Sequence, residues 1–187
     1  VDEEKRVVTP YDDVVSHIRS DCEASLRRLN VDVIDLYQFH VGDYDPLKAE
    51  AVVEALEDLV AAGKIRWYGW STDNPAGARV FAQGEHCTAI QHILNVAQDA
   101  PQILEICDQE NLASVNRSPL GMGMFTGKFT ADTRFPENDV RTTWDLHQGQ
   151  LAERLQKTEE LRQILTAGGR SMAQGALAWI WTRSPRT

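Results

Sequence analysis

The sequence lacks several signals that assign a chain to a broad class of protein. It has no apolar run long enough to span a bilayer and no recognisable signal peptide, so we expect a cytoplasmic protein without a membrane partner. Its cysteines, Cys22, Cys87 and Cys107, lie far apart and form no Cys-x-x-Cys pair. We therefore expect three reduced thiols that pack as small hydrophobic side chains.

Positive charge is also scarce. The chain has 19 Lys and Arg against 28 Asp and Glu, a net charge of −9, which argues against a nucleic-acid partner. The histidines His17, His86, His92 and His147 lack ligand spacing with one another or with the cysteines, so no metal site is expected. The Gly-x-Ser-x-Gly motif of a nucleophilic serine is missing too.

The clearest positive feature is the β-branched and aromatic segment Val33–His40, which is followed by Gly42 and Pro46 and predicts a strand. Alternation along a strand places Gln38 and His40 on one face, together with Ile34 and Leu36, and Tyr37 on the other. Both faces are mostly apolar, so we expect a parallel strand that is buried on both sides.

A repeat of strand and helix follows along the 187 residues, which suit one domain. The later strands are predicted to start at residues 65, 89 and 113, which are 24 residues apart, with one helix in each interval. Such connections give parallel neighbouring strands. The predicted strands are Val33–His40, Ile65–Trp70, Ala89–Leu94 and Ala113–Arg117. The first predicted helix starts between residues 9 and 13 and ends at Leu29, which belongs to its buried stripe. The other predicted helices span residues 48–62, 75–82, 101–110, 150–166 and 171–181.

This α/β pattern fits half of a (β/α)₈ barrel or part of an open, doubly wound sheet. No Gly-x-Gly-x-x-Gly motif follows a strand, which argues against the open, doubly wound sheet. The pattern of strands and helices alone still favours the two architectures almost equally.

Polar side chains follow the predicted strands: His40, the pair Ser71-Thr72, Gln91 and the pair Arg117-Ser118. Chemistry collects at the carboxyl ends of parallel strands, so we interpret His40 as functional rather than as a rim histidine held by a backbone carbonyl. Ser71 and Thr72 alone would equally suit a helix N-cap. Gln91 suits a carboxamide or sugar ligand, and equally a buried structural amide.

The segment Ser118–Lys128 heads a long Gly- and Pro-containing stretch that runs to about Gly149. Gly121, Gly123 and Gly127 would let backbone N–H groups approach a phosphate, and Lys128 would add charge, with Arg117 and Arg134 as helpers. Glycines also make ordinary turns, so both interpretations stay open.

Taken together, these segments resemble the aldo-keto reductase family, in which a strand ends in the catalytic histidine. They fall in the family's order and span nearly the whole chain. The matching segments are Ser25–Leu29, Val31–His40, Gly63–Arg66, Gly69–Ser71, Gln91 with Asn95, Ser118–Gly121 with Thr126–Lys128, and Ala173–Trp179.

The resemblance implies a (β/α)₈ barrel that binds NADP, with NAD as the alternative, and moves hydride to an aldehyde or ketone. It implies that His40 orients the substrate carbonyl, and that Ser71, Thr72 and Gln91 lie at the carboxamide of the nicotinamide. Arg117 would stack on the nicotinamide ring. The pyrophosphate would be lined by Ser118, Pro119, Leu120, Gly121 and Lys128, with Arg134 beside them.

The chain departs from the family pattern in several places. Thr72 stands where the family has Asn, and Leu94 where it has an aromatic residue. The family's catalytic Asp, Tyr and Lys precede the region that starts at Val1, and its last strand follows Thr187. We therefore expect one partial barrel domain over residues 1–187, covering about strands four to seven, without turnover by itself. Its open sheet edges favour a homo-oligomer. The alternative is a nucleotide-binding or structural module that never catalyses, and a barrel hydrolase is a distant third.

Overall fold

The computed structural model describes residues 13–187, and these residues form two compact units. We call the first the sheet unit and the second the helical unit. Among the described residues, the sheet unit consists of 13–92, Ala100–Val115 and Arg186, and the helical unit consists of Ile93–Asp99, Asn116–Pro185 and Thr187.

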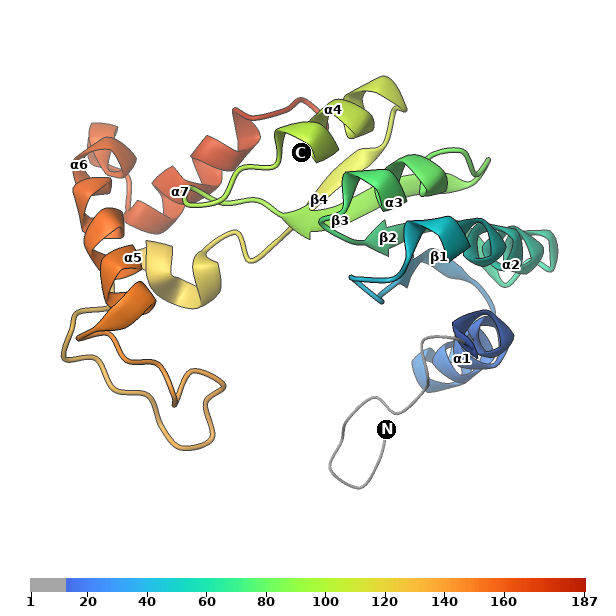
Figure 1. Ribbon diagram of the computed structural model, residues 1–187, viewed down its shortest axis with the longest axis horizontal. Helices are drawn as coiled ribbons and strands as arrows, with labels where there is room; N and C mark the ends of the chain where they lie inside the picture. Colours follow the sequence, from blue (N-terminus) through green and yellow to red (C-terminus); the bar gives the residue numbers. More distant parts are fainter. Residues whose placement is uncertain (1–12) are drawn as a thin grey trace. The chain divides into compact units, whose positions relative to one another are not determined.

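The sheet has four strands in the order β1-β2-β3-β4 (Figure 1). Strand β1 pairs with β2 in parallel, and β2 pairs with β3 in parallel. The predicted strand order is therefore confirmed. The strands are β1 (Ile34–Phe39), β2 (Ile65–Ser71), β3 (Cys87–Ile93) and β4 (Ala113–Arg117).

Helices alternate with these strands, as the repeat predicted. Asn30 ends the first helix in the left-handed conformation (φ 54°), and Asn74 caps the third, where its side chain accepts a hydrogen bond from the backbone N–H of Ala76. Proline takes the first position of the third and fourth helices, where no N–H is needed. The helices of the sheet unit are α1 (Val14–Leu29), α2 (Ala49–Ala61) after the short 3₁₀ helix η2 (Pro46–Lys48), α3 (Pro75–Phe81) and α4 (Pro101–Gln109).

Aromatic rings fill the core between the sheet and its helices. The ring of Trp70 on β2 lies 5.5 Å from that of Phe39 on β1 and 4.8 Å from that of Phe81 on α3. Trp70 is fully buried, and its indole Nε1 donates a hydrogen bond of 2.9 Å to the carbonyl of Val41. The core therefore fixes the backbone immediately after His40.

The expectation that both faces of β1 are buried is wrong for the described residues. Leu36 on β1 is 37% exposed, and its partner in the sheet register, Trp67 on β2, is 47% exposed. In a closed barrel, side chains from strands all around the barrel would fill the space over this face, and four strands provide only part of them. Leu29 is also exposed (62%) instead of buried, because it is the last residue of α1, where Asn30 turns the chain away.

The cysteines behave as expected in the described structure. Cys22 and Cys107 are fully buried, Cys87 is partly buried, and all three are free. Burial raises the pKa of Cys107 to about 11 and that of Cys87 to about 12, so both stay protonated thiols at neutral pH.

A partly buried carboxylate, Glu57 on α2, ties the start of β3 to the sheet. Its Oε1 accepts hydrogen bonds from the Tyr68 hydroxyl (2.6 Å) and from the backbone N–H of His86 (3.0 Å). Its Oε2 lies 2.6 Å from Nδ1 of His86. Burial opposes ionisation of Glu57, but these hydrogen bonds outweigh burial and lower its pKa.

Glu57→Gln is therefore expected to destabilise the protein at neutral pH by about 1–2 kcal/mol, the usual range for a charge-assisted hydrogen bond. Because folding lowers the pKa of Glu57, its ionised carboxylate stabilises the protein at pH values above its pKa in the unfolded state, about 4.3. This stabilisation is lost as the pH falls through the lower pKa that Glu57 has in the folded protein. Urea denaturation at several pH values should show the two proteins converging below about pH 4. A gap that does not narrow in acid would contradict an ionised Glu57.

The helical unit packs its helices around Met124, Phe125, Leu146 and Ala176. One continuous helix over 150–166 was expected, and this is wrong: the helix breaks at Leu161, whose N–H lies 3.3 Å from the carbonyl of Lys157, a long helical bond. The elements are η3 (Gly121–Thr126), α5 (Gly149–Glu160), α6 (Arg162–Leu165), η4 (Ala167–Gly169) and α7 (Met172–Trp181). Across the described residues, none of the helices combines the length and apolar character needed to cross a membrane.

Candidate active site

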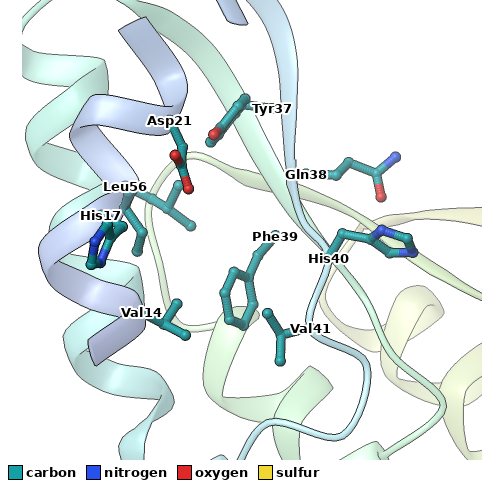
Figure 2. A pocket seen from close by; sticks show the side chains of 10 residues that line it. Val14, His17, Asp21, Tyr37, Gln38, Phe39, His40, Val41 and Leu56 are labelled. Carbon is teal, nitrogen blue, oxygen red and sulfur yellow. The ribbon is translucent and has the colours of Figure 1, made fainter. Parts of the chain in front are cut away.

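His40 lies immediately after the last residue of β1 and is exposed. Gln38 and His40 point to one side of the strand, while Tyr37 and Phe39 point to the other (Figure 2). The alternation predicted from the sequence is therefore confirmed. A pocket of about 240 Å³ runs along this strand, lined by Val14, His17, Ile18, Asp21, Leu56 and the five residues from Tyr37 to Val41.

Gln38 has an unsatisfied acceptor beside His40. Its side-chain oxygen Oε1 is buried, and no described residue donates a hydrogen bond to it. A buried acceptor without a partner is costly, by about 1–3 kcal/mol.

Ser71, the last residue of β2, lies beside Gln91, which is two residues before the end of β3. Their Cα atoms are partners in the parallel register, and Ser71 is 3% exposed while Gln91 is partly buried. The preceding pair in the register of β1 and β2 is Phe39 with Trp70, so His40 and Ser71 follow it at the same end of the sheet. The structure thus brings three of the four predicted residues of the sheet unit, His40, Ser71 and Gln91, to the same end of the sheet.

Thr72 forms hydrogen bonds with the backbone around it. It is fully buried, its N–H donates to the carbonyl of Gln91 (2.8 Å), and its hydroxyl donates to the carbonyl of Gly42 (2.9 Å). The same hydroxyl accepts from the N–H of Asn74 (3.1 Å). The N-cap of α3 is Asn74, so the alternative of Ser71 or Thr72 as the helix cap is wrong. Thr72 instead holds the loop after His40 against β2.

Apart from Arg117, which ends β4, the remaining predicted residues belong to the stretch that follows β4. Ser118 is left-handed (φ 54°), and its carbonyl accepts a hydrogen bond of 3.2 Å from the side chain of Asn95. Pro119 and Leu120 are partly buried, and Leu120 packs against the core of the helical unit. After them the chain forms η3, short 3₁₀ turns that are interrupted by a kink within the expected loop, with Gly121 at φ 55°.

Three basic residues flank this loop, and they differ in exposure. Arg117, the last residue of β4, is partly buried, and Lys128 is exposed. Arg134 is exposed and donates to the carbonyls of Ala131 (3.3 Å) and Thr133 (3.1 Å). Its guanidinium is thus folded back onto its own segment, whereas Lys128 is accessible to solvent.

Comparison with known families decides the class of protein. The family model described as the aldo/keto reductase family matches residues 9–187. The chain belongs to the aldo-keto reductase family. Among curated relatives, it is 30% identical over 171 residues to the Schizosaccharomyces pombe aldo-keto reductase yakc, whose name includes NADP(+). It is 31% identical over 170 residues to probable aldo-keto reductase 1 of Glycine max. The matches cover 88% of this chain in both cases, and 50% and 48% of the relatives.

Solved aldo-keto reductases share the fold. The glycerol dehydrogenase of Gluconobacter oxydans is similar with a TM-score of 0.80 and 29% identity, over 99% of this chain and 57% of that one. An aldo/keto reductase from Klebsiella pneumoniae, solved with NADP and acetate, has a TM-score of 0.61 and 28% identity, over 87% and 50%. The chain therefore spans about half the length of the relatives it matches, and its parallel α/β architecture is that of a partial (β/α)₈ barrel. The assignment to strands four to seven stays a prediction.

Sequence reasoning gave no site role to three residues of this aldo-keto reductase chain that affect the site. Gln38 is beside His40, Asn95 holds the carbonyl of Ser118, and Arg141 donates to the carbonyl of Met122. Gln38 had a usable signal, since it shares a strand face with His40, and Asn95 had one in its place among the segments that resemble the family, whereas Arg141 had none. In the described part of the chain, no group of three or more His, Cys, Asp or Glu side chains could hold a metal ion.

Proposed function

We propose that this chain forms part of an NADP-dependent aldo-keto reductase that reduces an aldehyde or ketone to an alcohol. The observation that carries the proposal is the convergence of His40, Ser71 and Gln91 at the carboxyl ends of adjacent parallel strands in a member of this family. The name of the S. pombe relative and the NADP complex of the K. pneumoniae relative support the choice of cofactor.

The cofactor, when bound, supplies a hydride to the carbonyl carbon. The residues at the ends of β1–β3 would then act on the substrate and on the nicotinamide. His40 would donate a hydrogen bond to the carbonyl oxygen as negative charge develops there. Ser71 and Gln91 would hold the carboxamide, with Thr72 shaping the backbone behind them. Near-rigid placement of these groups reduces the entropy that the reaction would otherwise lose.

The other predicted contacts lie in the helical unit. Arg117 would stack on the nicotinamide ring, while the segment from Ser118 to Gly121 and the exposed Lys128 would contact the pyrophosphate through backbone N–H groups and charge. Arg134 would assist from its own segment. NAD remains the alternative cofactor, and a homo-oligomer remains a prediction.

The proton that completes the alcohol needs a separate donor. Among the described tyrosines, Tyr37 lies on the opposite side of β1 from His40, and burial raises its pKa to about 12 (Figure 2). Tyr44 is buried with its ring edge against Phe39, and Tyr68 donates to Glu57. None of the three suits the acid. We therefore propose, in line with the family resemblance, that the proton donor lies outside residues 1–187 and that these residues alone do not turn over.

The test is NADPH consumption with a panel of reactive aldehydes, measured for the full-length protein and for a protein limited to residues 1–187. Turnover is expected only in the first. Turnover by the shorter protein would place the acid within this sequence and overturn the roles given above. Tight NADPH binding by the full-length protein without turnover on any aldehyde or ketone would favour the alternative, a nucleotide-binding module that does not catalyse.

A further inference from the structure

The segment around η3 has an unusual backbone. Three consecutive residues have positive φ: Gly121 at 55°, Met122 at 54° and Gly123 at 100°. Met122 carries a side chain in a conformation that L-residues rarely adopt, so local propensity does not explain it. Contacts from outside the segment must therefore stabilise this conformation.

One such contact comes from Arg141. Its guanidinium Nη1 donates a hydrogen bond of 2.9 Å to the carbonyl of Met122, which lies 19 positions earlier in the chain. The approach is close, because a Cβ on Gly123 would lie 3.1 Å from the same nitrogen and 2.8 Å from the ring of Phe129. The arginine thus contacts η3 at its strained residue.

Arg141 is itself fixed on three sides. Its Nε and Nη2 donate to the two carboxylate oxygens of Asp139 at 2.8 Å and 2.7 Å, a bidentate pair. Its guanidinium carbon lies 4.6 Å from the ring centre of Phe135 and 5.5 Å from that of Phe129. The hydrogen bonds from Arg141 lower the pKa of Asp139 to about 2, so the carboxylate stays charged at neutral pH. An arginine held in this way has little freedom to leave the Met122 carbonyl.

We propose that Arg141 is a positioning residue that keeps the backbone from Gly121 to Gly127 preformed for the pyrophosphate of the dinucleotide. This inference rests on the proposed function, because it assumes that the Ser118–Lys128 loop binds the cofactor. Arg141 acts through the carbonyl of Met122 and needs no contact with the cofactor. A loop that is already ordered loses less conformational entropy on binding, so the arginine raises affinity for NADPH without entering the chemical step.

A set of substitutions distinguishes the effect of the geometry of Arg141 from the effect of its positive charge. Arg141→Lys keeps the positive charge but loses the planar fork and the stacking on both rings. Asp139→Asn is a milder change that weakens the hold on Arg141, and it keeps the proposal testable if Arg141→Lys folds poorly. Val140→Ala, at a neighbouring residue that is 80% exposed, is the matched control. Lys128→Ala removes charge from the loop without touching the arginine.

Two measurements on the full-length protein test the proposal. In hydrogen–deuterium exchange without nucleotide, amides of residues 118–128 should exchange about tenfold faster in Arg141→Lys than in wild type, with β1–β3 unchanged. In steady-state kinetics, KM for NADPH should rise about tenfold while kcat at saturating NADPH stays within about twofold. Asp139→Asn should show smaller changes of the same kind, and Val140→Ala none.

The contrary outcomes are distinct. Unchanged exchange in Arg141→Lys would overturn the positioning role. A loss confined to kcat would also overturn it, because a preformed binding loop acts on affinity. Faster exchange with unchanged NADPH affinity, in a protein whose Lys128→Ala variant also binds normally, would instead remove the loop from the cofactor site, which is a failure of the proposed function.

Discussion

His40→Ala in the full-length protein is expected to lower kcat for aldehyde reduction by about 10²-fold or more, which corresponds to about 2.7 kcal/mol of activation free energy. The loss follows from the charge that develops on the substrate oxygen during hydride transfer. His40 is the exposed imidazole at the carboxyl end of β1, on the face that also carries Gln38 (Figure 2). Without it, the oxygen loses a hydrogen-bond donor in the transition state.

The matched control is His17→Ala. His17 lines the same pocket but comes from α1, on the side of β1 toward which Tyr37 and Phe39 point (Figure 2). Its replacement should leave kcat unchanged. NADPH consumption under saturating substrate measures both variants, and circular dichroism checks that both fold. An activity of folded His40→Ala close to that of wild type would remove the histidine from the catalytic step.

Gly69→Ala is expected to cost about 3 kcal/mol of folding stability, at the upper end for an overpacked core. Gly69 pairs with Ala89 at an irregularity between β2 and β3, and a Cβ at this position would overlap the carbonyl oxygen and carbon of Ala89. These are backbone atoms of the neighbouring strand, so they cannot move aside without disturbing the sheet.

A second glycine provides the comparison. Within residues 13–187, a Cβ on Gly42 would meet only the carbonyl oxygen of Ser71, at an ordinary distance of 3.7 Å. Gly42→Ala should therefore change stability by less than about 1 kcal/mol. Urea denaturation of the two variants and the wild type measures the difference. Equal unfolding midpoints for both variants would show that β2 and β3 can separate at Gly69 without loss.

The sequence predicted most of the strands because their signals are local. β4 has the predicted bounds, Ala113–Arg117, and β2 differs by one residue. β3 starts earlier than expected, at Cys87, because Cys87 pairs with Tyr68 on β2. That pairing depends on a neighbouring strand and leaves no trace in the local pattern.

The candidate site was predictable to the same extent. The alternation along β1 correctly placed the side chains of His40 and Tyr37 on opposite faces of the strand (Figure 2). The role of Thr72 was not predictable, since its hydroxyl bonds to a carbonyl 30 positions away. The exposure of Leu36 and Trp67 was missed for a related reason, because burial of a sheet face depends on what lies over it.

Two hydrogen bonds attach the loop that follows His40 to β2 and to the residue after it: Trp70 donates to the carbonyl of Val41, and Thr72 donates to that of Gly42. Because these two hydrogen bonds hold Val41 and Gly42 in place, we expect changes in the chain beyond Gly42 not to move His40. Exposed positions farther along, such as Asp43 and Leu47, which is 91% exposed, can therefore be varied while the geometry of the histidine stays intact. Libraries at these positions should retain folded proteins at a high rate, whereas libraries at Trp70 or Thr72 should not.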